Sequence, residues 1–177
     1  MEIDEGMWRP RSIWMPMIAA LLQLPQAAHA TPDGALVEDV AGIANQVSAM
    51  RSWDRASVER LIGHKLDLRD GDGPFAFFVA SNVRIGRLRV DVDFRWPRPN
   101  SGAKAGALLA FDLRAGCPSR KNVLARFGPL TLTDVPHGHS LDELSYWSRV
   151  SSNYKLSFGF PERAPECLAG FVFDHER

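Results

Sequence analysis

The residues best suited to chemistry lie in one short segment, Asp134-Val135-Pro136-His137-Gly138-His139-Ser140. Two histidines spaced i, i+2 point to one side of an extended chain and can both ligate a metal ion, with Asp134 as a third ligand. His139 beside Ser140 could instead act as the base of a hydrolase, but the Gly-x-Ser-x-Gly nucleophile motif is absent. Proline and glycine here are also typical of an exposed loop. We keep His137 and His139 as metal candidates and expect no cofactor.

Two pairs of acidic residues could support glycoside hydrolysis if each pair lay about 5–10 Å apart across a cleft. Asp91 and Asp93 share a strand face with arginines, which favours permanently ionised carboxylates over a general acid with a raised pKa. Asp142 and Glu143 are expected in the first turn of a helix capped by Ser140. The sequence contains no glycine-rich phosphate loop or dinucleotide motif. It therefore predicts that the protein is not an enzyme.

The two cysteines, Cys117 and Cys167, lack the C-x-x-C spacing of a zinc site. In an oxidising compartment such a pair is typical of a disulfide. We expect a Cys117–Cys167 bridge, with two separate buried thiols as the alternative.

The first thirty residues have the pattern of a secretory signal peptide. Arg9 and Arg11 supply positive charge, Ile13–Leu24 is apolar, and Ala28-His29-Ala30 is a small-x-small cleavage site. The apolar stretch is shorter than the roughly 20 residues that span a bilayer, so no stable membrane insertion is expected after cleavage. Residues 1–30 are therefore predicted to be removed, which leaves a periplasmic or secreted protein; the alternative is that this segment forms a buried N-terminal helix.

The composition excludes some partners and bounds the number of domains. The 177 residues are 45% hydrophobic, which suffices for the core of one domain or of two small lobes. Lys+Arg and Asp+Glu are equal at 21 each, so the chain lacks the excess positive charge of a nucleic-acid binder. No nucleic-acid partner is expected.

Apolar spacing predicts an α+β chain that contains two similar units. Helical intervals follow a cap at Asp33, and a second helix runs from a cap at Asp54 to a stop at Gly63. The interval that separates Val58 from Val123 also separates Gly63 from Gly128. Such a recurrence indicates stacked supersecondary units with one core. We expect two helix–three-strand antiparallel repeats packed side by side, with the helices on one face of the sheet. The expected parts are an N-terminal helix with the first repeat (31–116) and the second repeat (117–177).

The two helix ends, Val58–Gly63 and Val123–Gly128, and the strands after them resemble the tandem small domains of the β-lactamase-inhibitory-protein-like families. They also resemble the related small outer-membrane assembly lipoproteins. In both groups a helix end of this kind precedes a short antiparallel sheet. The resemblance implies an exported, non-enzymatic protein that grips another protein through its sheet face.

The segment Arg87–Arg95 alternates strictly, so its apolar residues share one strand face and its charged residues share the other. The charged face is either simply solvated or part of a recognition surface. Tryptophan, tyrosine and arginine dominate binding hot spots, which adds the aromatic residues near turns to the candidate surface. The candidate binding residues are Arg87, Arg89, Asp91, Asp93, Arg95, Trp96, Tyr146, Trp147 and Lys155.

These observations favour an exported protein-binding module of the inhibitor or immunity type. Its partner would be a protein, such as an envelope-acting enzyme or a toxin. Two alternatives stay open: a small exported metal-binding hydrolase centred on His137 and His139, and an envelope assembly scaffold.

Overall fold

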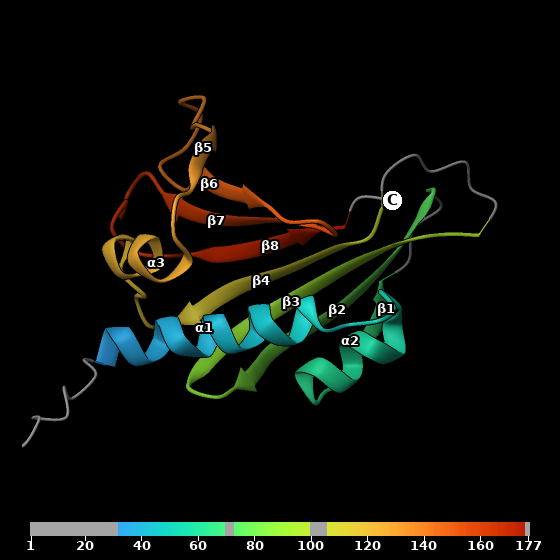
Figure 1. Cartoon of the computed structure of the whole chain (residues 1–177). Coiled ribbons are helices and arrows are strands. Elements are labelled where there is room, and N and C mark those ends of the chain that lie inside the picture. The colour runs from blue at the N-terminus through green and yellow to red at the C-terminus, as the bar shows by residue number, and fades with distance from the viewer. Residues whose placement is uncertain (1–31, 70–72, 100–105, 176–177) are drawn as a thin grey trace, which may run out of the picture.

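The computed structural model of the protein describes residues 32–69, 73–99 and 106–175. The predicted signal peptide, residues 1–30, lies outside the described residues. Within the described residues the fold is mixed α/β, with three helices and an eight-stranded antiparallel sheet (Figure 1). The helices are α1 (Pro32–Ser48), α2 (Arg55–Ile62) and α3 (Arg120–Phe127). The strands are β1 (Asp67–Arg69), β2 (Phe75–Ile85), β3 (Leu88–Pro97), β4 (Leu108–Ala115), β5 (Thr131–Asp134), β6 (Leu144–Val150), β7 (Lys155–Pro161) and β8 (Gly170–Asp174). In the described part of the chain, no helix is long and apolar enough to cross a membrane.

The strands lie in the order β1-β2-β3-β4-β8-β7-β6-β5. Strands β4 and β8 meet in the middle, where Phe111 is the register partner of Phe171. Three strands in each of two units would give six, so the predicted strand number is wrong. The two missed strands, β1 and β5, have only three and four residues, and every residue in them is exposed, so they bury no face of their own.

The helices predicted at α1, α2 and α3 are present, and capping groups mark the ends of the two short ones, α2 and α3. The Asp54 carboxylate accepts a hydrogen bond from Ser57 N at 2.8 Å, and Gly63 ends α2 with φ 64°. Asp33 does not cap α1 as predicted. It lies in the first turn, and its carboxylate instead accepts hydrogen bonds from Ser119 N and Asn122 Nδ2 of α3, each at 2.7 Å.

The predicted helix after Ser140 is absent. Leu141 and Asp142 form a turn, and β6 begins at Leu144. Glu143 is held by three loop amide groups rather than by the start of a helix. Because these amides satisfy its carboxylate locally, the acidic residues here stabilise a loop.

Side chains on one face of the sheet form the core. Leu88, Val90, Val92 and Phe94 of β3 are buried, as the alternation predicts. Helix α1 crosses this part of the sheet (Figure 1), with its buried side chains turned to the core. The largest buried rings are Phe94, Phe111, Phe158, Phe160, Phe171 and Phe173.

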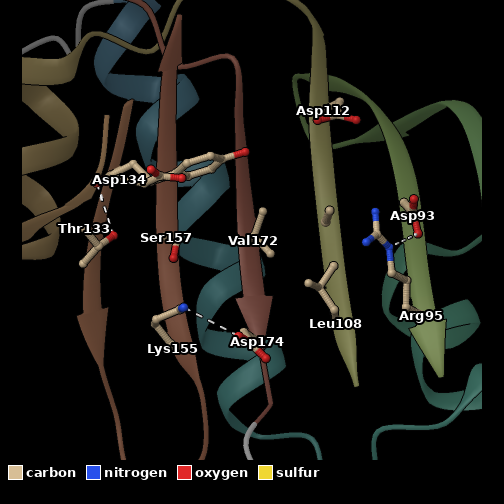
Figure 2. Close-up of a pocket in the computed structure, with 12 residues that line it drawn as sticks. Asp93, Arg95, Leu108, Asp112, Thr133, Asp134, Lys155, Ser157, Val172 and Asp174 are labelled. Carbon is tan, nitrogen blue, oxygen red and sulfur yellow. Dashed lines mark hydrogen bonds and ion pairs between the residues drawn. The ribbon is translucent and has the colours of Figure 1, made fainter. Parts of the chain in front are cut away.

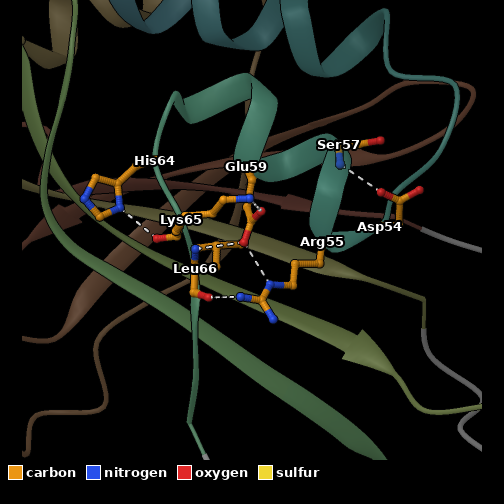
Figure 3. Close-up of polar contacts among 7 residues, drawn as sticks. All are labelled: Asp54, Arg55, Ser57, Glu59, His64, Lys65 and Leu66. Atoms are coloured by element: carbon orange, nitrogen blue, oxygen red, sulfur yellow. Dashed lines mark hydrogen bonds and ion pairs between the residues drawn. The ribbon is translucent and has the colours of Figure 1, made fainter.

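Helix α2 is joined to the start of the sheet through Glu59. Its carboxylate contacts Arg55 Nε and Lys65 Nζ, each at 2.8 Å, and accepts a hydrogen bond from Leu66 N at 3.1 Å (Figure 3). The hydrogen bond from Lys65, followed by those from Leu66 N and Arg55, lowers the pKa of Glu59 from 4.5 to about 2. The carboxylate is therefore held ionised at the junction of α2 and β1.

The predicted disulfide is confirmed: Cys117 is bonded to Cys167, with their Cα atoms 4.8 Å apart. Cys117 precedes α3, and Cys167 lies between β7 and β8. A β-bridge between Ser119 and Cys167 and a hydrogen bond from Leu168 N to Pro118 O lie beside it. The disulfide bond thus attaches the start of α3 to the connection between β7 and β8.

Candidate functional site

The face of the sheet opposite the phenylalanine core contains a groove of about 490 Å³. Figure 2 looks onto this groove face, with α1 behind the strands. Strands from both halves of the sheet contribute to the groove. It is lined by Asp93, Arg95, Leu108, Ala110, Asp112, Thr133, Asp134, Tyr146, Lys155, Ser157, Val172 and Asp174.

Antiparallel register places these side chains in rows that cross the strands. In the first row Tyr146 lies opposite Gly159, Gly159 opposite Gly170, and Gly170 opposite Asp112. The second row consists of Ser157, Val172, Ala110 and Asp93. The third row consists of Lys155, Asp174, Leu108 and Arg95. The groove therefore has a small apolar centre, a charged row on one side and a row without central side chains on the other.

Two glycines form the floor of the first row, and each is required by a close neighbour. A Cβ at residue 159 would lie 2.8 Å from Leu144 Cδ1 and 3.0 Å from Tyr146 Cε1. A Cβ at residue 170 would lie 2.7 Å from Phe111 O and 3.1 Å from Asp112 Oδ1. The Tyr146 ring and the Asp112 carboxylate thus each lean over a glycine, from opposite ends of the row.

Two of the groove's carboxylates are paired with groove cations. Arg95 Nε lies 3.5 Å from Asp93 Oδ1, and Lys155 Nζ lies 3.6 Å from Asp174 Oδ2 (Figure 2). The Asp93 oxygen is buried and accepts no hydrogen bond from the described residues, so Arg95 holds it by charge alone.

The other two groove carboxylates, Asp112 and Asp134, have no cation within ion-pair distance among the described residues. Among the described residues, Asp134 accepts a hydrogen bond from the neighbouring Val135 N alone, at 2.9 Å. The groove therefore carries a surplus of negative charge in and beside the glycine row.

Two residues that line the groove, Asp112 and Tyr146, have raised pKa values. The Asp112 side chain reaches solvent, yet the protein around it removes part of its hydration, and this raises its pKa. The Asp91 carboxylate, its register partner on β3, raises the pKa further. Burial, followed by the charges of Asp112 and Asp134, raises the pKa of the Tyr146 hydroxyl. The Tyr146 hydroxyl and the Asp112 carboxylate are thus within electrostatic reach of each other, and the charge of Arg114, which acts to lower the pKa of Asp112, does not reverse the rise.

Asp91 itself is engaged outside the groove. Its carboxylate binds the Arg114 guanidinium and accepts a hydrogen bond from Asn82 N at 2.8 Å. The bond from Arg114 lowers the pKa of Asp91. Asn82 lies in a bulge of β2 with φ 55°, and its side chain accepts a hydrogen bond from Arg89 Nη1 at 2.9 Å. This network stabilises the β2–β3–β4 region.

The structure divides the candidate binding residues between two faces. Arg89, Asp91, Asp93, Arg95, Tyr146 and Lys155 lie on the groove face. Arg87 does not belong to the charged strand face as predicted. It precedes β3 and turns to α1, where its Nη1 lies 3.1 Å from Asp39 Oδ1.

Two aromatic candidates also lie away from the groove. The Trp96 ring lies 6.0 Å from the ring of the buried Phe94, centroid to centroid. Trp147 pairs with the buried Phe158 and packs against the core. Tryptophan at these sites covers the edges of the core, and only Tyr146 among the predicted aromatic residues lines the groove.

The His137–His139 segment is a loop organised around Glu143. The Glu143 carboxylate accepts hydrogen bonds from the backbone N–H groups of His137, Gly138 and His139. These bonds, that of His137 first, lower the pKa of Glu143. Across the described residues, no three His, Cys, Asp or Glu side chains are placed to hold a metal ion.

Two groove carboxylates, Asp112 and Asp174, were missed from the sequence, and Asp134 was considered only as a third metal ligand. Asp112 and Asp174 each end an apolar run, Leu109-Ala110-Phe111-Asp112 and Phe171-Val172-Phe173-Asp174, so their outward position was visible in the pattern. Their proximity was not, because it depends on β4 pairing with β8 across the intervening α3 and β5–β7.

Compared with known proteins, the chain matches no family model, no curated protein and no solved structure.

Proposed function

We propose that this protein is an exported protein-binding module of the inhibitor or immunity type, which occludes a partner with its groove face. One observation carries the proposal: a groove of about 490 Å³ is lined from β3 to β5, across both halves of the sheet. Its lining combines a small apolar centre with charged and aromatic margins. A small apolar centre with charged margins supports recognition of a protein partner by electrostatic complementarity.

The predicted duplication supports the proposal. Each half would consist of an eight-residue helix, a glycine, a short exposed strand and three longer strands. The strand order is symmetric about the β4–β8 junction, as expected if a two-fold axis relates two copies of one unit. All three helices would then cover the core face and leave the opposite face free for a partner.

Export is supported by the disulfide, because such bonds persist in oxidising compartments. Together with the predicted signal peptide, the disulfide supports a location in the periplasm or outside the cell. The resemblance to tandem inhibitory domains supports the same reading. The partner class we propose is an envelope-acting enzyme or a toxin.

A matched pair of alanine-to-arginine variants tests the proposal. Ala110→Arg places a long side chain in the centre of the groove, and Ala125→Arg places the same side chain on an exposed position of α3. Tagged wild-type protein is used to capture partners from an extract of the cell envelope. We expect capture, and inhibition of the captured protein, to be lost in Ala110→Arg and kept in Ala125→Arg. Equal capture by both variants would contradict the groove assignment.

A further inference from the structure

The charges that line the groove do not balance. Four carboxylates and two cations line it, and each cation forms an ion pair with one of the carboxylates. The carboxylates left over among the described residues are those of Asp112 and Asp134, and both residues are exposed. Arg114 acts on Asp112 by its charge, but its guanidinium binds Asp91. The groove therefore holds two negative charges that an occupant can reach.

These two carboxylates lie on opposite sides of the groove. Asp134 is on β5 and Asp112 is on β4, four strand spacings away in the sheet, or about 19 Å at ~4.8 Å per spacing. Figure 2 shows Ser157 and Val172 between them. These two residues and Ala110 form one row across the strands, and all three have short side chains. A single side chain cannot reach both carboxylates, whereas an extended segment that crosses the strands can.

We infer that the groove receives a basic segment of the protein partner, with two cationic side chains about as far apart as Asp112 and Asp134. This inference rests on the proposed function and names the charge of the surface that the partner presents. The short side chains in the centre of the groove leave room for the backbone of the segment, and the two carboxylates attract its lysine or arginine side chains. An acidic segment would meet the same two carboxylates and be repelled.

A short peptide with two lysines is the probe. In acetyl-Lys-Ala-Gly-Ala-Gly-Ala-Lys-amide the lysines are separated by about 20 Å in an extended chain, at ~3.4 Å per residue. The peptide is titrated into the ¹⁵N-labelled protein, and we expect it to shift the amide resonances of Ala110 and Val172 in a saturable manner. An analogue with glutamine in place of the second lysine should bind several-fold more weakly. Analogues with glutamate or acetyl-lysine at both positions should give no saturable shift.

Two double variants locate the contact. Asp112→Asn/Asp134→Asn should weaken binding of the two-lysine peptide at least tenfold. Glu38→Gln/Glu166→Gln removes the same charge from two exposed ion pairs with α3, outside the groove, and should leave binding unchanged. The amide spectrum of each variant verifies its fold.

Several results would each overturn the inference. These are the absence of a saturable shift, binding of the one-lysine, glutamate or acetyl-lysine peptide as tight as that of the two-lysine peptide, full binding by Asp112→Asn/Asp134→Asn, or an equal loss of binding in the two double variants. The last result would show that the peptide responds to the net charge of the protein and not to the groove.

This experiment and the capture experiment fail separately. If Ala110→Arg abolishes partner capture but no basic peptide binds, the groove function stands and the basic segment is wrong. If the two-lysine peptide binds through Asp112 and Asp134 but wild-type protein captures no partner, the preference for a basic segment stands and the proposed function is wrong.

Discussion

Ionisation of the Asp112 carboxylate lowers the stability of the folded protein. Its pKa is raised by loss of hydration and by the nearby Asp91 carboxylate, and Arg114 pairs with Asp91 instead. A raised carboxyl pKa means that the folded state disfavours the ionised form. Residues that lower stability in this way are found at binding and catalytic sites, where a ligand later supplies the missing charge.

Asp112→Asn should therefore stabilise the free protein at pH 7, by less than about 1 kcal/mol because the side chain reaches solvent. The penalty exists only where Asp112 is ionised, so the gain should fall as the pH drops through the raised pKa. It should vanish below the ordinary value of 3.8, where the carboxyl is protonated in both states. Thermal unfolding at pH 7 and pH 3 measures the effect, with Asp142→Asn as the control. A loss of stability at pH 7 would show that Asp112 is structurally required.

The short elements depend on specific polar contacts because they bury little. Strand β1 is exposed at all of its residues, and α2 has only eight residues. Glu59 joins them by contacting Arg55, Lys65 and Leu66 N at once. Since these contacts require an ionised carboxylate, the junction is sensitive to pH.

Glu59→Gln should lower the free energy of unfolding at pH 7. The pKa of Glu59 is depressed from 4.5 to about 2 in the folded state, so its contribution is complete above 4.5 and is lost as the pH falls towards 2. The difference between wild type and variant should therefore shrink across that window. Urea unfolding at pH 7, 4.5 and 2 measures it. Glu38→Gln, in the exposed pair with Arg126, is the matched control and should show little change. A difference that persists at pH 2 would contradict the assignment.

At the scale of elements, the sequence predicted the helices and strands that bury one of their faces. The helices at α1, α2 and α3 and the long strands were visible because their apolar residues recur at helical or alternating intervals. Strands β1 and β5 were not, because they are held by backbone pairing at the sheet edges rather than by burial. The helix predicted after Ser140 was wrong for a similar reason. Acidic residues are typical of the first turn of a helix, but Glu143 instead accepts hydrogen bonds from the backbone of a loop.

At the scale of the whole molecule, α1 and the disulfide hold the parts of the sheet together. Helix α1 contacts α3 through Asp33 and the β2–β3 turn through Asp39. The Cys117–Cys167 bond closes a segment of 50 residues that contains α3 and β5–β7. The groove is made by strands on either side of the β4–β8 junction, so its shape depends on these links.

The double variant Cys117→Ser/Cys167→Ser should lose up to about 4 kcal/mol of stability, the chain-entropy estimate for a closed segment of this length. Urea unfolding of the variant and of wild type with and without a reductant measures the loss. Reduction should destabilise wild type to the level of the variant and leave the variant unchanged. A loss below about 1 kcal/mol would show that the neighbouring β-bridge and hydrogen bonds hold the junction without the bond.

The α+β class, the principal helices, the long strands, the cysteine pair and the charged face of β3 could all be predicted from the amino-acid sequence. Each of these follows from local spacing or from residue type, which the chain carries before it folds. The position of Asp112 and Tyr146 on either side of two glycines, and the place of Arg87, Trp96 and Trp147 away from the groove, could be found only from the folded structure. The physical reason is that a site across a sheet depends on strand order and register, and β4 meets β8 through pairing that no local pattern specifies.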